Sequence, residues 1–404
     1  LTVLLMPLAL LASFEAIKDR QKEYYAWMLV LMTAMNGVFL ARDLLLFYIF
    51  FELTLIPMFF IIGIWGGPER RYAAGKFFLF TFGGSVFTLA AIIYMGMKFG
   101  TFDIINVTAK AQTDLSSTER WWILLGLLAG LAVKVPLFPV HTWLPLAHTE
   151  APTAGSVILA GVLLKTGAYG LLRFAVPLFP HAATAFAPTA MALGVIAIIY
   201  GALLAFAQAD FKRLVAYSSI SHLGFVLLGI YAWNALALQG VVVQMLAHGI
   251  STGALFILAG ALQERLHTRN FAQLGGLWAS LPRLSSLGLF FAIASLGLPG
   301  LGNFIGEFLV LLGTWQRHPV FAVIGAFGTV TAAAYALLLV QRAFHGQPRK
   351  IEAPDLRARH IAVMAGLAAA IIWLGVSPQP VVDTAAPSLA ALRASAVTLG
   401  PGAP

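Results

Sequence analysis

Apolar runs, separated by short polar segments, make up most of this chain of 404 residues. Only 10% of the residues are charged and 60% are hydrophobic, whereas about a quarter of the residues of a soluble domain are charged. So few polar side chains cannot cover a surface that faces water. The sequence therefore predicts an all-α, polytopic membrane helix bundle, because helices satisfy their own backbone hydrogen bonds in lipid.

A membrane-spanning helix needs ~20 apolar residues. We expect about twelve spans, at residues 1–13, 26–41, 44–65, 75–98, 121–136, 153–176, 187–208, 212–231, 236–262, 283–299, 320–344 and 360–378.

Two shorter apolar pieces, near 140–148 and 303–315, follow runs that end in proline or glycine. We expect them to be the second halves of discontinuous helices, because proline removes a backbone donor and clashes with the preceding turn. The Pro/Ala-rich end of the chain, from Val376 to Pro404, is expected to be a short tail. Leu1 already lies inside an apolar run, which indicates that further sequence precedes it.

The positive charges fall unequally on the two sides of the predicted bundle. Sixteen lysines and arginines, among them Lys212, Arg349 and Lys350, fall on one side, and seven, among them Arg42, fall on the other. Loops rich in Lys and Arg face the cytoplasm, so both ends of the chain are expected on the outer side of a bacterial cytoplasmic (inner) membrane. This topology explains the net charge of +9 without a nucleic-acid partner.

The separation along the sequence between Glu52 and Lys134 is similar to that between His222 and Glu307, which suggests an internal duplication. Glu52 precedes a broken helix that carries Lys134, and His222 precedes a broken helix that carries Glu307. Interrupted hydrophobic segments at corresponding positions of two halves indicate a transport path. We expect a clipped N-terminal helix and loop (1–25), two inverted five-helix repeats (26–176 and 187–344), and a C-terminal helix and tail (345–404).

Four charged side chains lie inside the apolar runs: Glu52, Lys134, Lys165 and Glu307. A charge at the centre of a membrane helix costs about 2.5–3.5 kcal/mol on insertion scales. Such a residue serves either as half of a structural ion pair or in transport. The position of these charges beside helix breaks and histidines favours proton transfer, in which movement of Glu52 relative to Lys134 would change the proton affinity of that lysine.

Histidines lie near the same breaks. His141 and His148 follow the first break, and His222 and His248 lie inside later spans. Histidine titrates near neutrality and can pass a proton between its two nitrogens, although a single intramembrane histidine also occurs as a hydrogen-bonded interior residue. No histidine and carboxylate set has the spacing of metal ligands, so no metal site is expected.

The chain has no cysteine, which excludes cysteine-ligated iron–sulfur clusters. No stretch has the pattern of a glycine-rich nucleotide loop that opens a helix after a strand. If the protein serves a redox system, the electron carriers are expected on other chains.

Two long motifs resemble a known family. The first runs from Lys134-Val-Pro-Leu-Phe-Pro-Val-His141 through His148 to Lys165, and the second is Asp210-Phe-Lys-Arg-Leu-Val-Ala-Tyr-Ser-Ser-Ile-Ser-His222. They resemble the antiporter-like, proton-translocating membrane subunits of respiratory complex I, the NADH:quinone oxidoreductase. Glu307, where related subunits carry lysine, makes the chain most similar to the bacterial M type.

The resemblance implies a function and partners. It implies that Glu52 and Lys134 form an ion pair that gates the subunit, that Lys165 and His248 relay protons, and that Glu307 is the terminal carrier. It also implies supporting roles for His141 and His222. NADH, flavin, iron–sulfur clusters and quinone would be bound by partner subunits, and the chain would lie between the L-like and N-like membrane subunits.

Two other functions remain open from the sequence. The chain could be a subunit of a multisubunit cation/proton antiporter built on the same ancestor, or a membrane subunit of an energy-converting hydrogenase. Sodium-dependent exchange without a quinone reductase would indicate the antiporter.

Overall fold

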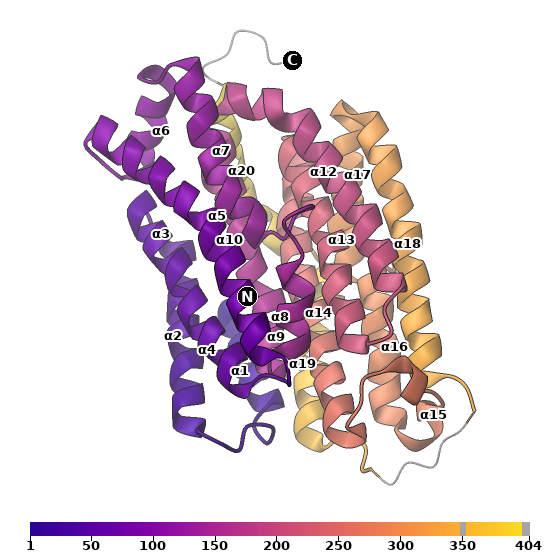
Figure 1. Ribbon diagram of the computed structural model, residues 1–404. Helices are drawn as coiled ribbons and strands as arrows, with labels where there is room; N and C mark the ends of the chain where they lie inside the picture. Colours follow the sequence, from indigo (N-terminus) through magenta and orange to yellow (C-terminus); the bar gives the residue numbers. More distant parts are fainter. Residues whose placement is uncertain (348–352, 398–404) are drawn as a thin grey trace.

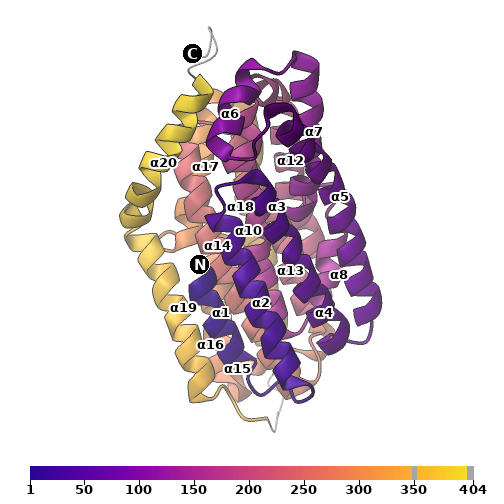
Figure 2. The same cartoon turned by 90° about the vertical axis from the view of Figure 1, so that its left-hand side faces the viewer.

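The computed structural model describes residues 1–347 and 353–397, and every regular element in this part of the chain is a helix. The helices stand side by side in one bundle (Figures 1 and 2). Eight helices among the described residues are long and apolar enough to cross a membrane, by length and composition. The predicted all-α membrane bundle is confirmed.

Each of the twelve predicted spans contains a helix. The corresponding elements are α1 (Thr2–Ala12), α2 (Gln21–Leu40), α3 (Leu44–Leu53) with α4 (Leu55–Trp65), α5 (Arg70–Phe99), α7 (Ser117–Lys134), α9 to α11 (Thr153–Leu178), α12 (Pro180–Phe206), α13 (Phe211–Ala232), α14 (Ala235–Leu266), α16 (Pro282–Leu296), α18 (Pro319–Phe344) and α19 (Ala358–Val376).

Both predicted discontinuous helices are present. Helix α7 ends at Lys134, two residues before Pro136, and α8 (Trp143–Glu150) follows the break. Helix α16 ends at Leu296 and is capped by Gly297, whose φ of 83° lies in the left-handed region that favours glycine, and α17 (Gly302–Arg317) follows the break. Each break therefore occurs where the sequence cannot continue a regular helix.

Two isolated backbone bridges indicate how the halves of the molecule are related. Asp43 pairs with Asp103 where α3 begins, and Asp210 pairs with Asn270 where α13 begins. The first lies beside α6 (Ile104–Thr113), at the upper end of the bundle in Figure 1, and the second lies at the opposite end, near α15 (Leu277–Ser280). Matching bridges at opposite ends are what an inverted repeat predicts. The exact bounds of the two repeats stay a prediction.

The prediction of a tail after residue 378 was wrong. Residues Gln379–Val397 form helix α20, which runs toward the upper end (Figure 2). Pro380 lies in the first turn, where proline is tolerated, and the alanines of the segment have the highest helix propensity. The helix continues past the interior Pro387. Residue 1, expected on the outer side, lies near mid-height in Figure 1. The predicted positions of Arg349, Lys350 and residues 398–404 lie outside the described residues.

Helices α5 and α7 approach closely through glycines. A Cβ atom at Gly130 would lie 3.0 Å from the Cα of Ser85, and one at Gly84 would lie 2.9 Å from the carbonyl oxygen of Ala129. The Thr88 hydroxyl donates across this contact to the carbonyl of Gly126, at 3.1 Å. Small residues that allow backbones to approach are the usual packing device of membrane helices.

We expect Gly130→Ala to destabilise the α5–α7 contact by about 1–3 kcal/mol, because the added methyl group overpacks it. The measurement is the thermal unfolding temperature of the purified protein. Gly83→Ala is the matched control, since a Cβ atom there meets nothing within 4 Å. Equal unfolding temperatures for the two variants would contradict this account of the packing.

Candidate functional site

Lys165 lies in the most irregular of the spanning helices. Two π-helical turns, Leu159–Leu163 and Leu171–Ala175, flank the α-helical turns that carry it. The buried Lys165 amine donates to the carbonyl of Ala160 and lies 2.6 Å from Nδ1 of His248. Single π-helical turns inside α-helices occur frequently at functional sites.

A close backbone approach brings Lys165 and His248 together. Gly161 precedes Lys165 by one turn, and Gly249 follows His248. A Cβ atom at Gly249 would lie 2.9 Å from the carbonyl oxygen of Gly161. The two glycines thus allow the Lys165 helix and α14 to touch at the depth of these two side chains.

His222 continues the row of polar side chains from His248. The two imidazole rings have centroids 5.5 Å apart. His222 Nδ1 lies 2.7 Å from Oε1 of Glu307, and Nε2 of Gln244 donates to the same carboxylate oxygen at 2.8 Å. We call Lys165, His248, His222 and Glu307 the central cluster; all four side chains are buried.

The second nitrogen of His222 is also in contact with polar groups. Nε2 lies 3.2 Å from the Ser295 hydroxyl and 3.0 Å from the hydroxyl of Tyr335. A hydroxyl can donate or accept, so Nε2 of His222 keeps a partner whether or not it carries the proton. Nδ1 keeps its partner after it loses its proton only when the Glu307 carboxyl is protonated, so the tautomer of His222 is linked to the protonation of Glu307.

Glu52 and Lys134 lie in a separate group on α3 and α7. The Lys134 amine donates to the Thr54 hydroxyl at 3.0 Å and lies 4.6 Å from the centre of the Phe51 ring. Glu52 interacts electrostatically with Lys134, but within the described residues no pair of their charged atoms lies within 4.0 Å. The fold therefore brings Glu52 and Lys134 near each other, as predicted, but without direct contact between their charged atoms. We call Glu52, Thr54 and Lys134 the Glu52 cluster.

Two predicted connections are not made. His141 packs beside the rings of Phe138 and Tyr200, at centroid distances of 5.9 and 5.5 Å, and in the described part of the chain it contacts neither cluster. Lys134 and Lys165 have no hydrogen bond to each other among the described residues, although a Cβ atom at Gly167 would lie 2.9 Å from the Cβ of Lys134. The two clusters are adjacent but separate.

Four polar residues of the site were not predicted from the sequence: Thr54, Gln244, Ser295 and Tyr335. Gln244 precedes His248 by four residues, and this spacing places both on one face of α14. That signal was available in the sequence. Tyr335 lies in an apolar run far from any motif, and only the packing of α18 against the rest of the bundle brings it to His222.

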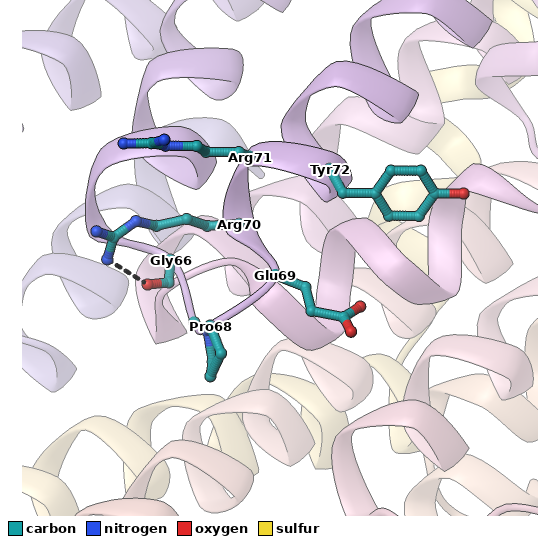
Figure 3. A pocket seen from close by; sticks show the side chains of 7 residues that line it. Gly66, Pro68, Glu69, Arg70, Arg71 and Tyr72 are labelled. Carbon is teal, nitrogen blue, oxygen red and sulfur yellow. Dashed lines mark hydrogen bonds between the residues drawn. The ribbon is translucent and has the colours of Figure 1, made fainter.

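An open surface pocket lies elsewhere, in the loop before α5 (Figure 3). Its lining residues are Gly66 to Tyr72, and Arg70 donates to the carbonyl of Gly66 at 3.3 Å. Figure 3 shows the Arg70 and Arg71 side chains pointing to one side and those of Glu69 and Tyr72 to the other. None of the residues of the two clusters lines this pocket.

Comparison with known families identifies the family to which this fold belongs. Residues 41–332 match the model of the NADH:quinone oxidoreductase/Mrp antiporter transmembrane family. The chain belongs to this family. The matched segment includes every residue of the central cluster and of the Glu52 cluster, so both clusters lie in the part of the chain that defines the family.

Individual members of the family resemble this chain over nearly its whole length. The chain is 51% identical to NADH-quinone oxidoreductase subunit M of Pseudomonas aeruginosa and 47% identical to that of Escherichia coli, covering 96% and 95% of this chain and 78% of each relative. A chain of respiratory complex I from Thermus thermophilus superimposes with a TM-score of 0.91 at 34% identity, over 99% of this chain and 84% of that one. A chain of the Mrp complex from a Dietzia species shares the fold, with a TM-score of 0.88 at 18% identity, over 99% of this chain and 84% of that one.

We expect Thr54→Val to change the protonation equilibrium of the Lys134 amine, because the substitution removes the hydroxyl that accepts the hydrogen bond from this amine. A hydrogen bond to a charged group contributes about 1.5–3 kcal/mol, which corresponds to a change of about tenfold or more in the protonation equilibrium. The measurement is proton transport by the reconstituted protein in its complex. Thr81→Val is the control, since its buried hydroxyl bonds only carbonyls of its own helix. Equal transport by both variants would show that the Thr54 contact has no role.

Proposed function

We propose that the chain is the M-type proton-translocating membrane subunit of an NADH:quinone oxidoreductase. The observation that carries the proposal is the central cluster, in which Lys165, His248, His222 and Glu307 succeed one another inside an apolar bundle. Intramembrane ionisable residues that face one another are characteristic of proton relays. The similarity to curated M subunits and to a complex I chain supports the same function.

The residues have distinct roles in this proposal. Lys165 transfers a proton to His248, His222 receives it from the neighbouring ring, and Glu307 accepts it from His222 Nδ1. Each donor and acceptor is an ordinary proton-transfer group, and the short contacts are already in place at both ends of the row. The 5.5 Å between the two imidazole centroids is the step at which a ring must turn.

The Glu52 cluster is proposed to couple transport to chemistry elsewhere. Since Glu52 interacts with Lys134 without touching it, a small displacement of α3 changes the field at the amine. Redox chemistry on partner subunits, which would hold NADH, flavin, iron–sulfur clusters and quinone, supplies the displacement. His141 is proposed to support this region rather than the central cluster.

The placement in the membrane follows from charge. The lower end of the bundle in Figure 1, where α13 begins with Lys212 and Arg213, is proposed to face the bacterial cytoplasm, by the distribution of Lys and Arg. The proposed neighbours in the membrane are L-like and N-like subunits.

We expect Lys134→Met and Glu307→Gln to leave the complex assembled but to reduce the number of protons pumped per quinone reduced, because each removes one titratable group. The measurement combines the acidification of proteoliposomes with the rate of quinone reduction. Lys98→Met is the control, since that lysine pairs with Glu119 outside both clusters.

Normal proton pumping by both variants would overturn the proposed function. Sodium-dependent exchange that continues without any quinone reductase would indicate a cation/proton antiporter instead.

A further inference from the structure

Asn303 lies at the break between α16 and α17 with its amide unpaired. It is the second residue of α17, its side chain has zero exposure to solvent, and neither its amide oxygen nor its amide nitrogen has a hydrogen-bond partner within the described residues. Burying a polar group without a partner costs about 1–3 kcal/mol. An unpaired buried amide in a native structure therefore requires an explanation.

Helix capping does not provide that explanation. An asparagine at the start of a helix usually accepts a hydrogen bond from a backbone N–H of the first turn. The N-cap position of α17 is Leu301, and among the described residues no side chain caps this helix. An apolar side chain of the same shape would avoid the cost of burial. The amide of Asn303 thus indicates a partner that reaches it in another state of the site.

Glu307 follows Asn303 by one helical turn. The two residues are four apart in α17, a spacing at which carboxyl and amide side chains form hydrogen bonds on one face of a helix. The side chains of a helix also lean toward its N-terminus. This tilt directs the Glu307 carboxyl toward the turn that carries Asn303.

The Glu307 carboxylate is held on one side only. Both of its hydrogen bonds within the described residues are made by Oε1, with His222 and with Gln244. Oε2 lies on the side of the helix break, where a Cβ atom at Gly297 would be 3.6 Å away. Because Gly297 has no side chain, space remains beside Oε2, and the carboxyl can turn there away from His222.

Protonation changes which partner suits the Glu307 carboxyl. In the proposed transfer the N–H bond at Nδ1 of His222 breaks and an O–H bond forms on Oε1, so an imidazolium and a carboxylate become two neutral groups. The attraction between opposite charges that held the carboxylate at His222 is then lost. A protonated carboxyl both donates and accepts, as an amide does, whereas a carboxylate only accepts. The Asn303 amide can therefore pair at both its atoms with the protonated carboxyl, but not with the carboxylate.

We propose that Asn303 is a positioning residue that receives the Glu307 carboxyl after it has been protonated. The inference rests on the proposed function and deepens it. The carboxyl O–H donates to the amide oxygen of Asn303, and the amide nitrogen donates to the other carboxyl oxygen. Nε2 of Gln244, released from Oε1, takes the place of Glu307 at Nδ1 of His222. The proton is thus held away from His222, which makes the transfer to Glu307 directional.

The test uses the intact complex and three measurements: protons pumped per quinone reduced in proteoliposomes, the infrared band of the protonated Glu307 carboxyl during turnover, and the thermal unfolding temperature. Asn303→Leu removes the amide and keeps a similar shape, and Asn303→Gln restores an amide on a longer side chain. Thr314→Val is the matched control on the same helix, because its buried hydroxyl donates to Val310 at 2.7 Å. Glu307→Gln assigns the band and sets the level of pumping without the terminal carrier.

We expect Asn303→Leu to lower the pumping ratio toward that of Glu307→Gln. The carboxyl band moves to higher wavenumber in this variant, because the protonated carboxyl loses its hydrogen bonds to the amide. The unfolding temperature does not fall, since the substitution removes a buried polar group that had no partner. We expect Asn303→Gln to recover part of the pumping and of the band position, and Thr314→Val to behave as the unmodified protein does.

Normal pumping by Asn303→Leu, with loss of pumping in Glu307→Gln, would overturn the role of Asn303 and leave the proposed function standing. Reduced pumping with an unshifted carboxyl band would place the partner of Asn303 elsewhere and would also overturn this role. Should Asn303→Leu fail to assemble, Asn303→Ala, which also lacks the amide, decides by the same measurements. Normal pumping by Glu307→Gln would overturn both proposals.

Discussion

The contact between the Lys165 amine and the His248 imidazole constrains the rest of the site. The two nitrogens lie 2.6 Å apart in a fully buried environment, and no carboxylate forms an ion pair with Lys165 among the described residues. Two adjacent cations repel strongly at low dielectric, so the pair holds one proton more readily than two. A group of this kind titrates as a unit, and it can pass a proton on when a neighbour moves.

The division into two clusters separates two tasks. The central cluster provides a sequence of donors and acceptors that are already in contact at both ends. The Glu52 cluster provides an interaction across a gap, in which Thr54 rather than Glu52 holds the Lys134 amine. A gap is suited to control, because the interaction between charges varies with distance, whereas a hydrogen-bonded contact is suited to transfer. Each cluster lies beside a break in a helix, where backbone groups at membrane depth need polar neighbours.

The sequence predicted the helices well because lipid leaves few alternatives. Long apolar runs have to be helical, and Pro136 and the glycines after Leu298 locate both breaks. The charged residues of the site were found because charge is rare in such runs. Its uncharged members were missed. Only tertiary packing shows that Thr54 and Tyr335 contact the site, whereas the four-residue spacing of Gln244 from His248 already placed it on the same face of α14. The tail was mispredicted because its prolines were interpreted as helix breakers, although Pro380 lies in the first turn of α20 and the helix continues past the interior Pro387.

The central claim is that these buried groups exchange protons during turnover, and infrared difference spectroscopy tests it most directly. Spectra of the intact complex are recorded before and during quinone reduction, with Glu307→Gln used to assign the carboxyl band. The account predicts a band of protonated carboxyl that changes during turnover and is missing from the variant. A spectrum in which the protonation of Glu307 stays constant while protons are pumped would contradict it.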